Sequence, residues 1–139
     1  MILLDTNVLS ALMQERPDPA VVGWLDAQAP ESIWTTAVTV FEIRFGIELL
    51  APSRRRRALE AAFDAMLRDD LSGRVAAFDS VAAEEAARLA TRRQRRGRPV
   101  DLRDTRIAGI ALARRAALAT RNVRHFDGLN VNLVNPWTE

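Results

Sequence analysis

The chain opens with Met1-Ile2-Leu3-Leu4-Asp5-Thr6-Asn7, and this stretch decides the class of fold. Four apolar residues in succession predict a short buried strand. The polar triplet behind them predicts the start of a helix, because the side chain of Asp5 can accept a hydrogen bond from the first turn. A strand that leads directly into a helix is the opening of an α/β unit.

The rest of the chain alternates strands and helices in the same way. Runs rich in strand formers predict strands at 32–35, 74–78, 117–120 and 131–134. Helical patterns and end signals predict helices between Pro19 and Pro30 and at 36–50, 54–68, 80–96 and 102–115. This alternation implies a three-layer α/β fold with a mainly parallel central sheet flanked by helices. No linker or repeat divides the 139 residues, so we expect one domain over 1–139.

Composition excludes several kinds of site. The sequence has no cysteine, which excludes disulfides and thiolate ligands, and a lone histidine, His125, which excludes a histidine-rich zinc site. No stretch has the pattern of a signal peptide or a membrane span. We therefore expect a soluble, cytoplasmic protein that does not contact membranes.

All 20 basic residues are arginine, and two groups of them are clustered. One run covers 54–57, and the other consists of Arg92, Arg93, Arg95, Arg96 and Arg98. Guanidinium groups offer paired donors to phosphate oxygens, so both clusters are candidates for binding a nucleic-acid backbone. The alternative for each is a solvated helix surface.

Two acidic residues in the first third of the chain are expected to point inward. Asp5 ends the first strand, where open parallel sheets bind ligands, and a helix cap is its alternative role. Glu42 lies on helix 36–50 among residues expected to face the core at helical spacing, namely Val38, Phe41, Phe45 and Leu49. A carboxylate there needs a cation, which is either a metal ion or a partner such as an arginine.

Asp104 is the third acid, in the first turn of helix 102–115. It begins the face that carries the apolar residues of this helix, whereas Arg103, Arg106 and Arg114 are expected on a different face. Favourable interaction with the helix dipole is its alternative role, with Asp101 as the N-cap. Three inward carboxylates repel one another unless a cation joins them. Oxygen-only ligands favour Mg²⁺ or Mn²⁺.

These residues carry a family resemblance over nearly the whole chain. The opening 1–10, the stretch 40–46 around Glu42, Asp104-Thr105-Arg106-Ile107-Ala108, Ala119-Thr120-Arg121-Asn122 and the closing 134–137 resemble the motifs of PIN domains, specifically VapC-type toxins close to the FitB group. Each motif is short, but their order and spacing together are specific. The resemblance implies a PIN fold and endoribonuclease activity that depends on Mg²⁺ or Mn²⁺.

The resemblance also assigns roles to residues. It implies that Asp5, Glu42 and Asp104 are the metal ligands, and that Thr6 and Asn122 assist catalysis by hydrogen bonding. Some family members have a fourth acid where this chain has Asn122, so a second metal would be held weakly here. His125 stands where an aspartate often stands and is a candidate supporting residue.

A VapC-like protein is expected to be the toxin of a type II toxin–antitoxin system. It would cut RNA, form a homodimer, be inhibited by a cognate antitoxin, and contact DNA only through that antitoxin. Two alternatives remain open on the sequence. One is a non-catalytic PIN-like module that binds nucleic acid through its arginines, and the other is a DNA-directed nuclease with the same metal chemistry.

Overall fold

A computed structural model describes residues 1–139 and contains one five-stranded parallel sheet. The strands are β1 (Ile2–Leu4), β2 (Ile33–Thr36), β3 (Val75–Ala76), β4 (Ala117–Ala119) and β5 (Asn132–Val134). Their order across the sheet is β3-β2-β1-β4-β5, and every neighbouring pair is parallel. The opening strand is therefore central, as its unbroken apolar run predicts for a strand covered on both faces.

Six α-helices connect the strands, where the sequence predicts them. They are α1 (Thr6–Leu12), α2 (Pro19–Asp26), α3 (Ala37–Glu48), α4 (Arg54–Ala65), α5 (Ser80–Arg95) and α6 (Leu102–Arg114). Each begins after an Asp, Ser or Thr whose side chain accepts a backbone N–H from the first turn. Helix α4 continues into a π-helical segment, Met66–Asp70, and short 3₁₀ turns occupy Pro30–Ser32 and Val123–Phe126.

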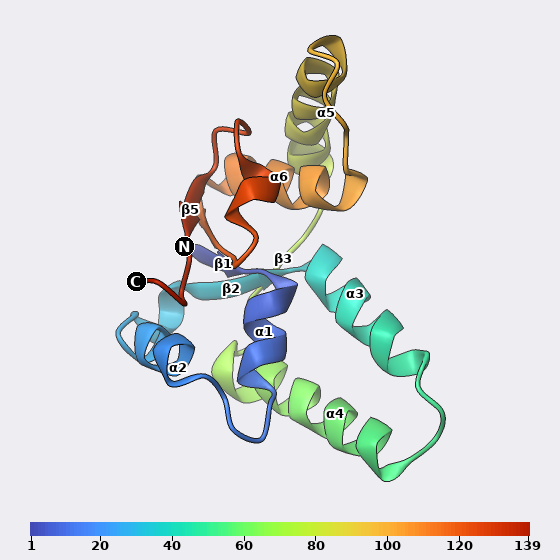
Figure 1. The fold of residues 1–139 in the computed structure, drawn as a ribbon, viewed down its shortest axis with the longest axis vertical. Helices are drawn as coiled ribbons and strands as arrows, with labels where there is room; N and C mark the ends of the chain where they lie inside the picture. Colours follow the sequence, from blue (N-terminus) through green and yellow to red (C-terminus); the bar gives the residue numbers. More distant parts are fainter.

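The helices form a layer on each side of the sheet, which confirms the expected three-layer α/β fold. Helices α5 and α6 lie on one side, and α1, α2 and α4 lie on the other (Figure 1). Successive residues of β1 face opposite helix layers, because side chains alternate along a strand. Leu3 belongs to the core beneath α5 and α6, and Leu4 belongs to the core beneath α1 to α4. No helix is both long enough and apolar enough to cross a membrane.

The orientation of α3 differs from the prediction. Phe41, Phe45 and Leu49 are exposed by 69%, 55% and 71%, whereas the buried positions of the helix are Thr39, Ile43 and Ile47. Helix α3 has two apolar faces, both with helical spacing, and the sequence pattern alone does not distinguish between them. The face with aromatic residues is larger, but the face with β-branched residues meets the core.

Helices α5 and α6 approach each other closely at Gly109. A Cβ atom at this position would lie 2.6 Å from the carbonyl oxygen of Ala82 and 2.8 Å from the Cβ of Ala86. The absent side chain therefore allows α6 to lie against α5. This contact fixes the position of α6, whose first turn carries Asp104.

Candidate active site

The carboxyl ends of the central strands lie beside the first turns of two helices, and this arrangement creates a polar site. Asp5 follows β1, and Thr120 follows the neighbouring strand β4. Helix α3 begins directly after β2 and carries Glu42 one turn further on, while α6 brings in Asp104. Asp5 and Asp104 are buried, as expected, but the side chain of Glu42 is 38% exposed because α3 turns its other face to the core.

Asp5 is held by both of its carboxylate oxygens. Oδ1 accepts the backbone N–H of Thr6 at 2.8 Å, so this residue is the N-cap of α1. Oδ2 accepts the hydroxyl of Thr120 at 2.8 Å and the amide of Asn7 at 3.3 Å. The capping role and the ligand role that the sequence leaves as alternatives are thus compatible, because they use different lone pairs of one carboxylate.

Arg103 lies between the carboxylates of Asp5, Glu42 and Asp104, which we call the acid cluster. Its Nη2 donates to Asp5 Oδ1 at 2.6 Å, its Nε donates to Glu42 Oε2 at 2.5 Å, and its Nη1 donates to Asp104 Oδ1 at 2.7 Å. Nη2 also donates to the Thr6 hydroxyl at 2.9 Å. The expectation that Arg103 points to a different face from Asp104 is wrong. In the first turn of a helix, a long side chain can fold back toward an anionic pocket instead of following the helical surface.

Asp104 has a second basic neighbour. Its Oδ2 lies 3.3 Å from Nδ1 of His125, which belongs to the 3₁₀ turn after β4. Its backbone N–H donates to the side chain of Asp101, so Asp101 is the N-cap of α6, as the sequence predicts.

The pKa values of Glu42 and Asp104 are shifted in opposite directions. Burial raises the pKa of Asp104, and this effect outweighs the hydrogen bond from Arg103. Burial also acts to raise the pKa of Glu42, but the hydrogen bonds from Arg103, the nearby Thr6 hydroxyl and the positive charge of Arg103 together lower that pKa. Both acids pair with Arg103, so the difference follows from depth, since Glu42 is the more exposed of the two.

A cavity of about 330 Å³ opens over these groups, and no hydrophobic residue lines it. The lining consists of Thr6, Asn7, Glu42, Asp101, Arg103, Asp104, Asn122 and His125. Asn122 is exposed at its edge, and its backbone N–H donates to the hydroxyl of Thr120 at 3.0 Å. The structure thus brings together every residue that the sequence proposes for the site, apart from the arginine cluster.

The donor set suits a hard divalent cation, but the guanidinium of Arg103 lies between the donors. The carboxylates and the Thr6 hydroxyl offer only oxygen atoms, which Mg²⁺ and Mn²⁺ prefer. In the present arrangement no three acidic or histidine side chains stand close enough together to hold a metal ion. The chemistry of the donors therefore suits such an ion, while the space between the three carboxylates holds the guanidinium of Arg103.

The predicted arginine cluster lies at and beyond the end of α5. Arg93 donates to the backbone carbonyls of Asp127 at 2.8 Å and of His125 at 3.5 Å, so it secures the segment that carries His125. Arg98 lies near the same segment. A Cβ atom added to Gly128 would be 3.4 Å from the Nη1 atom of Arg98. Four members, Arg92, Arg95, Arg96 and Arg98, are exposed, and only Arg93 is half-buried.

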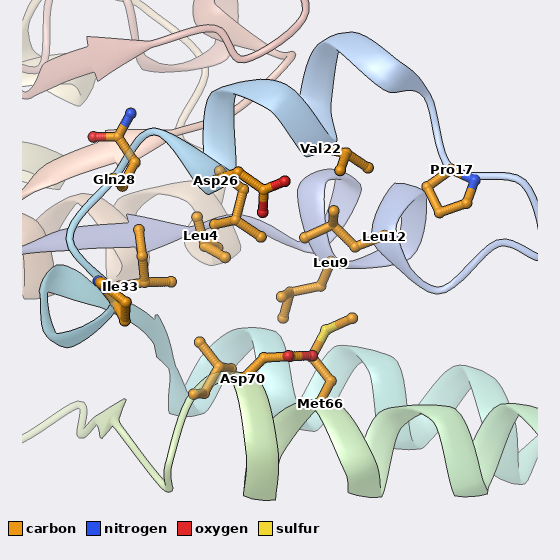
Figure 2. Close-up of a pocket in the computed structure, with 13 residues that line it drawn as sticks. Leu4, Leu9, Leu12, Pro17, Val22, Asp26, Gln28, Ile33, Met66 and Asp70 are labelled. Atoms are coloured by element: carbon orange, nitrogen blue, oxygen red, sulfur yellow. The ribbon is translucent and has the colours of Figure 1, made fainter.

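A second cavity, of about 350 Å³, lies away from the acid cluster. Leu4, Leu9, Met66 and other apolar side chains line it, with Asp26 and Asp70 among them (Figure 2). Its walls come from β1, α1, α2 and the π-helical segment after α4. Most of its lining residues are hydrophobic, whereas no hydrophobic residue lines the cavity over the acids.

Sequence reasoning missed three contributors to the site. Arg103 is the most important, and its position next to Asp104 and four residues before the buried Ile107 was the available signal. Asn7 and Thr120 hold the second oxygen of Asp5 and are bonded to each other at 3.2 Å. Both lie directly beyond the ends of adjacent strands, which is the signal that could have found them.

Known proteins resemble this chain over its full length. The PIN domain family matches residues 2–130. The VapC ribonuclease Y4jK of Sinorhizobium fredii is 36% identical over 137 residues, which cover 99% of this chain and 98% of that protein. The toxin FitB of Neisseria gonorrhoeae is 32% identical and covers 99% of both. A crystal structure of FitAcB from the same organism superposes with a TM-score of 0.86 at 31% identity, covering 100% of both chains. The chain therefore belongs to the PIN domain family, as its motifs indicate.

Proposed function

We propose that this chain is the toxin of a type II toxin–antitoxin system and hydrolyses RNA phosphodiester bonds at the acid cluster, with Mg²⁺ or Mn²⁺ as its metal. One observation carries the proposal. The carboxylates of Asp5, Glu42 and Asp104 come from three separate elements and converge on a single cation. The likeness to a VapC ribonuclease and to the toxin FitB supports the same activity.

The three carboxylates would hold the ion, and their neighbours would orient the reactants. A bound Mg²⁺ would lower the pKa of a coordinated water and neutralise the charge that develops on the phosphate. Thr6 and Asn122 line the same cavity and offer hydrogen bonds to water or phosphate. His125 would support the site by fixing the carboxylate of Asp104.

Recognition of RNA would begin with backbone charge. We assign this role to Arg92, Arg95, Arg96 and Arg98, which are exposed, and a scaffold role to Arg93, whose guanidinium donates to the backbone carbonyl of Asp127. Arg98 is only six residues from Asp104, so the chain between them spans at most about 20 Å. A phosphate backbone bound along the end of α5 is therefore within reach of the acids.

Protein partners are also proposed. The exposed rings of Phe41 and Phe45 stack with their centroids 5.9 Å apart, and Leu49 continues this apolar stripe along α3. Such stripes on soluble proteins mark protein interfaces. FitAcB and FitAB bound to a DNA fragment are solved complexes of similar chains. We propose that this protein likewise binds a cognate antitoxin, pairs as a homodimer, contacts DNA only through the antitoxin, and acts in the cytoplasm as one domain over 1–139.

A non-catalytic PIN-like module is the second candidate, and the position of Arg103 favours it. The guanidinium already neutralises part of the acid cluster, so the carboxylates do not require a metal in order to remain together. In that case the arginines would bind nucleic acid and the acids would only stabilise the fold.

Cleavage of total RNA by the purified protein separates the two candidates. Reactions contain Mg²⁺ or EDTA, with the wild-type chain, Asp5→Asn and Asp104→Asn, and a parallel arm contains single-stranded DNA. Discrete RNA fragments that require both the metal and the two acids support the ribonuclease. Equal inertness of all three proteins, with RNA binding retained, supports the binding module, and preferential cleavage of DNA would redirect the assignment to a DNA nuclease.

A further inference from the structure

We propose that Arg103 is a built-in competitor of the catalytic metal. Its guanidinium occupies the position among the three carboxylates that a divalent ion needs, and the ion binds only when this side chain leaves. Arg103 would thereby set the concentration of metal at which the enzyme becomes active. The inference rests on the proposed function, because it concerns how the same site is loaded.

The guanidinium of Arg103 donates to the oxygens that are proposed as metal ligands. Each of its three nitrogen atoms donates to a different carboxylate, at 2.5 to 2.7 Å. Nη2 makes two further contacts, to Glu42 Oε1 at 3.1 Å and to the Thr6 hydroxyl at 2.9 Å. A divalent ion would need the same oxygens at about 2.1 Å. The two cations cannot share this small space, because their like charges would repel one another.

With Arg103 in place, one of the three negative charges of the cluster is neutralised. Without it, the full charge of three carboxylates is available to attract an ion, and their mutual repulsion is relieved only when an ion binds. Removal of Arg103 should therefore weaken the metal-free fold and strengthen metal binding.

The side chain of Arg103 can move from the acid cluster into solvent. Arg103 is 29% exposed and lines the polar cavity, whose other walls include the exposed residues Asn122 and His125. Rotation about its side-chain bonds would carry the guanidinium into water without disturbing the apolar core. Displacement by metal therefore requires no movement of a helix.

Arg106 provides a matched control. It lies three residues further along α6, is exposed, and takes part in no salt bridge. Arg103→Ala and Arg106→Ala remove the same charge and the same atoms from one helix. Only the first removes a cation from the acid cluster.

The test is calorimetric titration of Mn²⁺ and of Mg²⁺ into the full-length wild-type chain, Arg103→Ala and Arg106→Ala, together with thermal unfolding of each with and without metal. Arg103→Ala is expected to bind metal about tenfold more tightly than wild type, which corresponds to 1.4 kcal/mol. Its Tm without metal should fall, and metal should raise that Tm more than it raises the wild-type value. Arg106→Ala should bind metal within about twofold of wild type.

If Arg103→Ala binds metal no more tightly than wild type does, the proposed competition between Arg103 and the metal is wrong. If this variant does not fold without metal, Arg103→Lys replaces it, since an ammonium lacks the planar fork of donors that matches these carboxylates and should yield to metal more readily than wild type. Binding of metal by none of the variants would contradict the metal dependence in the proposed function. Finite but equal affinities would contradict only the role of Arg103.

Discussion

Asp5 combines two roles at the scale of a single residue, and substitution can separate them. Asparagine is as good an N-cap as aspartate, whereas alanine offers no acceptor. Asp5→Ala is therefore expected to lower the free energy of unfolding by about 1 kcal/mol more than Asp5→Asn does. Both substitutions remove the negative charge and should abolish RNA cleavage. Urea unfolding and a cleavage assay on the same samples measure the two effects, and equal stabilities would show that the cap contributes nothing.

Glu42 should give the protein a measurable dependence on pH. Its pKa in the folded state is lowered below the ordinary value of 4.5, because the hydrogen bonds from Arg103, the nearby Thr6 hydroxyl and the positive charge of Arg103 together outweigh the effect of burial. A lowered pKa contributes stability that is present above about pH 4.5 and is lost as the pH falls through the folded-state pKa. Glu42→Gln lacks this contribution. The stability difference between wild type and this variant should therefore be constant above pH 5 and shrink below about pH 4.5.

Urea unfolding followed by tryptophan fluorescence between pH 6 and pH 3.5 measures this difference. Asp104 has a raised pKa and acts with the opposite sign, but it is present in both proteins and largely cancels. Glu15→Gln is the control, because Glu15 is exposed and forms no salt bridge. A stability difference for Glu42→Gln that stays constant down to pH 3.5 would contradict the pairing with Arg103.

The orientation of α3 is testable at the scale of an element. Ile47 is 5% exposed and belongs to the core, while Leu49, two residues later, is 71% exposed. Ile47→Ala should lower the free energy of unfolding by about 2–4 kcal/mol through lost contacts and a cavity. Leu49→Ala, which removes an equal number of atoms, should change it by about 0.5 kcal/mol or less. Chemical denaturation measures both free energies. A larger loss of stability for Leu49→Ala than for Ile47→Ala would show that the face predicted from the sequence meets the core.

Elements were easier to predict from the sequence than the directions of their side chains. Strand runs, helix caps and breakers are local signals, so all five strands and all six helices were found, although β3 is shorter than its run. Which apolar face of α3 meets the core depends on residues of that core such as Leu4 and Ala119, which are remote in sequence. The partial exposure of Glu42 and the inward turn of Arg103 were missed for the same reason.

At the scale of the whole molecule, the parallel order of the strands brings the acidic residues of the site close together. Parallel strands place their carboxyl ends at one edge of the sheet, so Asp5 and Thr120 become neighbours although 115 residues separate them. The inward carboxylates of Asp5 and Asp104 were predictable from their places behind a strand and in the first turn of a helix, whereas Thr120 was missed. The identity of the cation between the carboxylates was not predictable, because an arginine and a metal ion satisfy the same requirement for charge.

Hydrolysis by a metal-activated water makes a distinctive product, and the ends of the RNA fragments therefore test the central claim most directly. Total RNA is incubated with the wild-type protein and Mg²⁺, and the termini of the discrete fragments are identified chemically. We predict cleavage that stops with EDTA and leaves a phosphate monoester on one fragment and a hydroxyl on the other. Fragments that end in 2′,3′-cyclic phosphate and form equally well in EDTA would show attack by the ribose itself, and would contradict a hydrolase built on Asp5, Glu42 and Asp104.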